Sequence, residues 1–273
     1  MFWRNLPSIS GDSVEETWHY FSQGQYQQQS RPVIANTYEY RNGDRQAWHS
    51  HEQLQFIFTT RGVLSVITSQ GSWTLGPNRG LLLLPRTGHE LYASGEALMH
   101  SIYIEPDVWR HERKECCVLL VSSLLRELVL EMVKERRQET YILSEMIVPL
   151  LLRGLHEAQE LQQGCLPLPE DRRLQKICKA LMLAPSNNES LEIWGDRIGT
   201  SDRTLSRLFI KQTGYTFGQW RQQLRLVESM TRLAQGMAVA TIATELGYRS
   251  SSSFITMFRK AMGETPQNYF KKG

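Results

Sequence analysis

Apolar and polar residues alternate in short runs over the first part of the chain. Between Val33 and Glu105 these runs are rich in β-branched and aromatic residues, and glycine or proline separates them. Such spacing is typical of short antiparallel strands that close into a small barrel or sandwich. The predicted strands are VIANTYEY, LQFIFTT, VLSVITS, SWTLG, LLLLP, ELYAS and LMHSIYIEP.

After Pro106 the apolar spacing becomes helical. Apolar residues recur every three or four positions over 118–138, and a second helix is expected over 141–163 with a kink or restart at Pro149. The pair can cover the core of the barrel, or one helix can form a coiled interface with a second subunit. The pattern leaves both alternatives open, and both can hold.

These patterns predict an α+β fold with two domains. Residues 1–163 form the first domain, with a β-barrel at about 33–105 and trailing helices at about 117–163. Two prolines within 164–170 exclude a continuous helix there, so this segment is the predicted linker. The remainder, 171–273, predicts an all-α bundle of seven helices. Its first four helices are expected at 171–184, 191–198, 202–212 and 217–235.

The helical part of the chain contains an internal repeat. Gly199–Trp220 is echoed by Gly247–Tyr269, with most matching positions 49 residues apart. In each copy a small residue stands four positions before a glycine, as in the turn of a helix-turn-helix motif: Gly195 before Gly199, and Ala243 before Gly247. The helix between the copies would be roughly 28 Å long. Successive major-groove faces lie about 34 Å apart, so both motifs could read one side of a duplex.

Charge is distributed unevenly between the two parts. Residues 171–273 carry 16 Lys and Arg against 8 Asp and Glu, whereas residues 1–170 carry 15 against 20. A basic domain joined to an acidic one indicates that the basic half binds nucleic acid and that the acidic half has a different function. The four cysteines lack C-x-x-C spacing, and the start of the chain lacks the pattern of a signal peptide. No apolar run is long enough to cross a bilayer, so we expect a cytoplasmic protein.

Residues 171–272 resemble the DNA-binding domain of bacterial transcription regulators of the AraC/XylS family. The most specific stretch is Ala238–Phe270, and Arg203–Gly214 followed by Arg221–Leu226 is the looser first copy. The marks of the second copy are Ile242, Ala243, Leu246, Gly247, Tyr248, Phe254, Phe258, Arg259, Gly263, Pro266 and Tyr269. The resemblance implies a sequence-specific, promoter-binding regulator, either an activator or a repressor.

The resemblance also implies which side chains meet DNA. In the first motif, 191–212, they are Arg203, Ser206, Arg207 and Lys211. In the second motif, 239–262, they are Arg249, Ser251, Ser252, Ile255, Thr256, Arg259 and Lys260. Lys211, Arg249, Arg259 and Lys260 are the expected phosphate contacts. Arginine can pair with guanine through two hydrogen bonds, whereas serine and threonine discriminate weakly. The first recognition helix should therefore read sequence more sharply than the second.

The barrel carries a second motif, G-x5-H-x-H-x3-Q-x6-G, between Gly43 and Gly62. It resembles the first cupin motif, with glutamine in place of its glutamate, while the segment from Gly80 to Gly88 resembles the second motif with shifted spacing. The resemblance implies that residues 1–163 are a cupin-like sensor and dimerisation domain with a cupin-like β-barrel. The candidate ligands for a divalent transition metal are His49, His51, Gln55 and His89. The alternative is that these histidines are hydrogen-bonded at a strand end or in a pocket for an organic effector.

Aromatic residues on or beside the strands offer candidates for an effector pocket, although some must belong to the core. They are Trp48, Phe56, Phe58, Trp73 and Tyr103. The expected protein is thus a homodimeric regulator that binds promoter DNA, acts with RNA polymerase and responds to a small molecule or a metal. The alternative is a metal-dependent cupin enzyme with an accessory DNA-binding domain, against which the missing glutamate counts.

Overall fold

A computed structural model describes residues 31–109, 115–138, 143–161 and 165–271. The polar segment 1–30 and the first residue of the predicted linker, Gly164, lie outside the described residues. The chain divides into two compact units. Of the described residues, one unit holds those up to Cys165 together with Ala234–Gly236 and those from Gln267 onward, and the other holds Leu166–Leu233 and Met237–Pro266.

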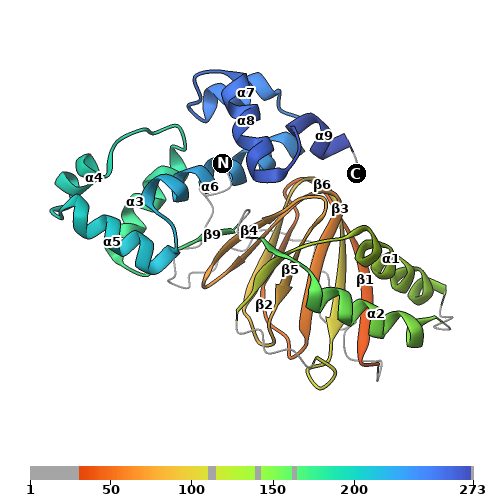
Figure 1. The fold of residues 1–273 in the computed structure, drawn as a ribbon. Helices are drawn as coiled ribbons and strands as arrows, with labels where there is room; N and C mark the ends of the chain where they lie inside the picture. Colours follow the sequence, from red (N-terminus) through yellow and green to blue (C-terminus); the bar gives the residue numbers. More distant parts are fainter. Residues whose placement is uncertain (1–30, 110–114, 139–142, 162–164, 272–273) are drawn as a thin grey trace. The chain divides into compact units, whose positions relative to one another are not determined.

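The first unit is a twisted antiparallel sheet with two helices on one side (Figure 1). The strands run in the order β1-β6-β3-β5-β7-β8, with β2 paired to β6 and β4 to β3. Their bounds are β1 Val33–Tyr40, β2 Arg45–His49, β3 Leu54–Thr68, β4 Gly71–Leu75, β5 Arg79–Leu83, β6 His89–Ile104, β7 Cys117–Leu120 and β8 Glu160–Leu161. The predicted sheet-rich N-terminal domain is confirmed.

Two strands are longer than predicted. The runs expected to end at Gly62 and Gly95 are joined into the single strands β3 and β6, which pair along most of their length. Both glycines have φ of +77°, and the register of the pair shifts between Thr59 and Val63. These glycines mark bulges rather than turns, because a left-handed residue lets a strand bend without ending its ladder.

Helices α1 (Ser123–Gln138) and α2 (Ser144–Glu157) follow β7. The helix predicted from residue 118 begins later, because Val118 and Leu119 are buried and pair with β5 as a strand. The second helix ends at Glu157 rather than 163, and Glu160–Leu161 pairs with β7. It also runs through Pro149 without a restart.

The faces of the sheet have separate cores. Phe56 and Phe58 pack with Leu125, Val129 and other apolar residues of α1 and α2. The other core contains strand residues such as Ile57, Val66 and Trp73, and it is the interior of the barrel. Side chains of β3 therefore alternate between the helix layer and the interior, as the two-residue period of a strand requires.

The second part of the chain is helical, as predicted. After the short strand β9 (Cys165–Pro167), residues 172–271 form the seven expected helices. They are α3 Arg172–Leu183, α4 Leu191–Ile198, α5 Asp202–Thr213, α6 Phe217–Ala234, α7 Val239–Glu245, α8 Ser251–Met262 and α9 Pro266–Lys271. No helix within the described ranges is long and apolar enough to cross a membrane.

Candidate functional site

The first candidate surface is the exposed face of α5. Ser201 caps this helix by accepting a hydrogen bond from the backbone N–H of Thr204, and Gly214 ends it with φ of +72°. Leu205 and Phe209 are fully buried and fix its inner face. Consequently the four predicted DNA contacts of this motif are all exposed: Arg203, Ser206, Arg207 and Lys211.

The turn before α5 has the geometry of a helix-turn-helix motif. Gly199 has φ of +68°, and a Cβ built on Gly195 would lie 2.4 Å from the carbonyl oxygen of Thr200. The second copy repeats the arrangement, with Gly247 at φ of +77° and the Tyr248 N–H donating to the carbonyl of Ala243. The positive φ predicted for both glycines is therefore present.

Helix α8 presents the second candidate surface. Ser250 and Ser253 form a reciprocal capping box at its start, and Phe254 and Phe258 are fully buried. The hydroxyl of Thr256 donates to the carbonyl of Ser252. The predicted contacts Arg249, Ser252, Thr256, Arg259 and Lys260 are exposed, and Ser251 and Ile255 are half-buried. No acidic residue lies in the first turn of α8.

Two arginines of α6 bind the loop that joins α3 to α4. Arg221 donates to the carbonyls of Asn187 (2.8 Å) and Glu189 (3.2 Å), and Arg225 donates to the carbonyl of Pro185 (2.9 Å). Both guanidinium groups also donate to Oδ1 of Asn188. We name Pro185–Glu189 with Arg221 and Arg225 the arginine junction. The sequence motif marked these arginines but not their partners.

The arginine junction also contacts the second motif. The Arg225 guanidinium lies 5.6 Å from the ring centre of Tyr248, which follows the turn glycine of that motif. A Cβ on Gly247 would lie 3.0 Å from the carbonyl oxygen of Ser186. The loop before the first motif therefore contacts the turn of the second motif, and two arginines of α6 bind that loop.

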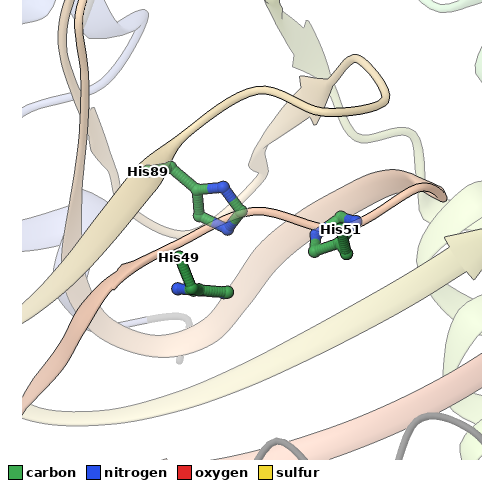
Figure 2. Close-up of side chains that lie close together, drawn as sticks. All are labelled: His49, His51 and His89. Atoms are coloured by element: carbon green, nitrogen blue, oxygen red, sulfur yellow. The ribbon is translucent and has the colours of Figure 1, made fainter.

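The third candidate site is a cluster of three histidines at one end of the barrel (Figure 2). His49 ends β2, His51 follows it, and His89 begins β6. Ring centres of His49 and His89 are 4.2 Å apart, and those of His51 and His89 are 5.4 Å apart. One ring nitrogen from each residue lies within 4.8 Å of the others. The structure thus brings together three of the four proposed metal ligands.

The three imidazoles share one hydrogen-bonding arrangement. The Nδ1 atom of each lies beside a backbone carbonyl two residues away: His49 beside Ala47 (2.9 Å), His51 beside Gln53 (2.8 Å) and His89 beside Thr87 (2.8 Å). A neutral imidazole that donates from Nδ1 has its lone pair on Nε2. The Nε2 atom of His89 is buried and has no hydrogen-bond partner among the described residues. This is the donor pattern of metal-binding histidines.

Burial favours the neutral form of His89 and of His49. Desolvation, with the neighbouring His49 as the next cause, lowers the pKa of His89 to about 3. Desolvation also lowers the pKa of His49. Neutral imidazole is the form that binds a metal, so the lowered pKa of His89 and of His49 favours metal binding at neutral pH.

Gln55 lies beside the cluster and supports it. Its side chain is buried, with Oε1 2.9 Å from Nε2 of His51 and its amide nitrogen 2.7 Å from the Ser101 hydroxyl and 2.9 Å from that of Tyr103. If His51 donates from Nδ1, its Nε2 must accept a hydrogen bond. With the Gln55 amide turned over, its nitrogen donates to Nε2 of His51 and its oxygen accepts from the hydroxyls of Ser101 and Tyr103. Gln55 therefore contacts His51 directly, and its own role as a metal ligand stays a prediction.

The five aromatic candidates for an effector pocket do not gather in one place. Phe56 and Phe58 belong to the core under α1 and α2, and Trp73 belongs to the barrel interior. Trp48 is 54% exposed and lies over Gly88, while Tyr103 is buried beside His51. Phe56, Phe58 and Trp73 are therefore among the aromatic residues that were expected to be core, and strand alternation sends them to opposite faces. An effector pocket lined by a subset of the five stays a prediction.

Comparison with known proteins identifies both parts of the chain. Residues 32–144 match the model of the AraC-like ligand binding domain, and residues 194–272 match that of a helix-turn-helix domain. The transcriptional regulator NimR of Escherichia coli K12 is 29% identical over 225 residues, which cover 82% of each chain. The regulator RipA of Corynebacterium glutamicum is 34% identical over 103 residues, covering 38% of this chain and 31% of RipA.

Among solved structures, fatty-acid-bound ToxT of Vibrio cholerae aligns over 87% of this chain and 94% of its own, with 14% identity and a TM-score of 0.37. The relatives named here are regulators of transcription. With an AraC-like ligand-binding domain ahead of a helix-turn-helix domain, this chain belongs to the AraC family of transcriptional regulators.

Proposed function

We propose that this regulator binds promoter DNA through α5 and α8 and that its barrel binds a transition metal at the three histidines. The single observation that supports the metal is the buried Nε2 of His89, which has no hydrogen-bond partner within the described ranges, while its Nδ1 lies beside the Thr87 carbonyl. The observation that supports DNA binding is that α5 and α8, the corresponding helices of the two repeats, are both capped and each have an exposed face.

The reading of DNA is tested at Arg207. This side chain is exposed at the middle of α5, where a guanidinium can pair with guanine. Arg207→Ala should weaken operator binding by about 1–3 kcal/mol and relax specificity at one base pair. Lys179→Ala, an equally exposed change on α3, is the control. Equal losses on operator and random DNA would make Arg207 a phosphate contact only.

Zinc fits the chemistry of the cluster. Three neutral imidazoles leave a fourth position for water or an effector group, and zinc takes nitrogen ligands at about 2.0–2.1 Å. Tetrahedral ligands at that length lie roughly 3.3 Å apart. The present nitrogen separations, up to 4.8 Å, would therefore contract on binding. The metal would supply a positive centre for an anionic or polar effector.

Elemental analysis of protein purified without chelator tests the metal. We expect about one metal ion per chain, and loss of that ion in His49→Ala and His89→Ala. Gln55→Leu should retain the metal with roughly 10–100-fold lower affinity, since it removes only the support of His51. His156→Ala, an exposed histidine on α2, is the control. A content well below one ion per chain in the wild type would overturn the proposal.

The proposal also includes two protein partners, a second copy of this chain and RNA polymerase. Helix α2 exposes an apolar stripe of Leu143, Met146 and Leu150 at 43%, 71% and 56% exposure, beside its buried face. A second copy of α2 is the natural partner for such a stripe in a homodimer. We place the dimer in the cytoplasm, where it would contact RNA polymerase at promoters. We assign it no enzymatic activity, since the motif has Gln55 where a carboxylate ligand would stand.

A further inference from the structure

A second cavity lies in the first unit and shares no residue with the histidine cluster. It has a volume of about 280 Å³, and both polar and apolar residues line it. The residues that line it are Phe58, Thr59, Thr60, Pro77, Asn78, Ser123 and Arg126.

The cavity results from the way β3 and β5 separate. Their pairing ends at Phe58 and Gly80, and β3 then bulges after Thr59. The turn before β5 leaves the sheet at Asn78, which has φ of +65°. The carbonyl of Asn78 accepts a hydrogen bond from Val121, so this turn is fixed to the segment that enters α1. Bulges of this kind often redirect side chains next to a binding site.

The hydroxyl of Thr59 has no partner in this cavity. Thr59 is fully buried, and its Oγ1 makes no hydrogen bond within the described part of the chain. The neighbouring Thr60 differs, because its hydroxyl lies 2.9 Å from Nε2 of His100. An unpaired buried hydroxyl destabilises the folded protein, and a bound hydrogen-bond acceptor would remove that cost.

The remaining polar groups of the cavity favour an anion. Ser123 is the first residue of α1, a helix of 16 residues with no acidic side chain in its first turn. At the start of α1 the Leu125 N–H donates to the Ser122 hydroxyl at 3.1 Å, and the N-terminal end of a helix carries partial positive charge. Arg126 adds a full charge, and it forms an ion pair with exposed Glu127 at 3.1 Å. Such a surface pair is weak enough to be exchanged for a ligand.

We propose that this cavity binds a small organic carboxylate. The carboxylate would accept hydrogen bonds from Arg126, the Thr59 hydroxyl and the start of α1, and its apolar part would lie against Phe58 and Pro77. Binding itself is independent of the histidine cluster. Only the role of the bound carboxylate as an effector rests on the proposed function.

Isothermal titration of the full chain with benzoate and hexanoate tests the site, with benzamide, hexanamide and inorganic phosphate as comparison probes. We expect a carboxylate to bind and its amide to bind at least tenfold more weakly. Arg126→Gln should weaken carboxylate binding roughly tenfold or more, as expected for a charged hydrogen bond. Thr59→Val should weaken it several-fold while leaving the melting temperature of the free protein unchanged or higher.

Arg153→Gln is the matched control, because Arg153 is an exposed, carboxylate-paired arginine on α2 outside the cavity. Equal affinity in Arg126→Gln and Arg153→Gln would overturn the proposal, as would binding of neither carboxylate at millimolar concentration. Binding of phosphate alone would overturn the assigned ligand class. All these outcomes are measured as carboxylate affinity, so a failure of DNA binding or of metal binding would not produce the same result.

Discussion

At the residue scale, Gly62 shows how one position determines the course of a strand. Its φ is +77°, and a Cβ there would lie 2.0 Å from the carbonyl oxygen of Glu96 and 2.7 Å from Cα of Ala97. Both atoms belong to the backbone of β6, which cannot move without breaking the ladder. Only glycine satisfies the backbone conformation and the close approach together.

Gly62→Ala should therefore destabilise the first unit by about 3 kcal/mol, combining left-handed strain with a backbone clash. Gly43→Ala is the matched control, because Gly43 also has a positive φ (+91°) but has no atom within 4 Å of the added Cβ. It should cost about 1 kcal/mol. Urea denaturation of the two variants measures the difference, and equal losses would show that the close approach is unimportant.

His89 predicts a pH dependence of stability. Its folded pKa of about 3 lies below the ordinary 6.5, so between these values the unfolded chain binds a proton that the folded chain does not. The free energy of unfolding should therefore fall as the pH is lowered from 6.5 toward 3. The contribution of His89 to the slope is at most about 1.4 kcal/mol per pH unit, and it is absent above 6.5.

Denaturation in the presence of a chelator, between pH 7 and 4, measures this effect. His89→Gln should show a shallower decline than the wild type, since the other titrating groups are common to both. Parallel curves would mean that His89 titrates normally in the folded protein.

At the element scale, the arginine junction explains how two motifs on one chain can be held in register. The loop Pro185–Glu189 is bound by Arg221 and Arg225, and it touches the turn at Gly247. We expect Arg225→Gln to loosen the second motif relative to the first. The variant should lose less affinity than the wild type when half a helical turn of DNA is inserted between the half-sites.

The measurement is the ratio of affinities for the native and the expanded operator. Lys179→Gln removes the same charge from an exposed position on α3 and should leave the ratio as in the wild type. An unchanged ratio in Arg225→Gln would show that α6 alone sets the spacing.

The stripe on α2 makes a second prediction at this scale. Met146→Glu should convert the proposed dimer to monomer in sedimentation experiments, because it places a charge in an apolar interface. Met146 is 71% exposed in the single chain, so its melting temperature as a monomer should hardly change. Glu145→Gln, an exposed change on the same helix, is the control and should leave the dimer intact. A wild-type protein that sediments as a monomer would contradict the proposed interface.

The elements also show what the pattern of residues could and could not predict. Capped helices of the second unit were predictable within one or two residues, because Ser201, Gly214 and similar ends act locally. Residues 118–120 were predicted as helix, since three or four apolar residues cannot distinguish a helix from a buried strand. The convergence of His89 on His49 and His51 was suggested by motif spacing. Their shared Nδ1 contacts and the orphan hydroxyl of Thr59 depend on tertiary register, which no local pattern encodes.

At the scale of the whole molecule, the metal and the operator should be thermodynamically linked if the metal acts through the regulator. Any factor by which zinc changes operator affinity must equal the factor by which operator changes zinc affinity. Such coupling typically amounts to about 5–150-fold, or 1–3 kcal/mol. The two factors can be measured separately, by operator titration with and without zinc and by zinc titration with and without operator.

We expect equal factors different from one in the wild type, and a factor of one for operator binding in His89→Ala, which retains α5 and α8 but lacks the buried ligand. Equal operator affinity in zinc-loaded and zinc-free wild type would restrict the histidine cluster to a structural role. The carboxylate cavity would then be the remaining candidate for the signal, because its polar groups are independent of the histidines. Repeating the cycle with benzoate in place of zinc, and Arg126→Gln in place of His89→Ala, determines which of the two sites is coupled to DNA.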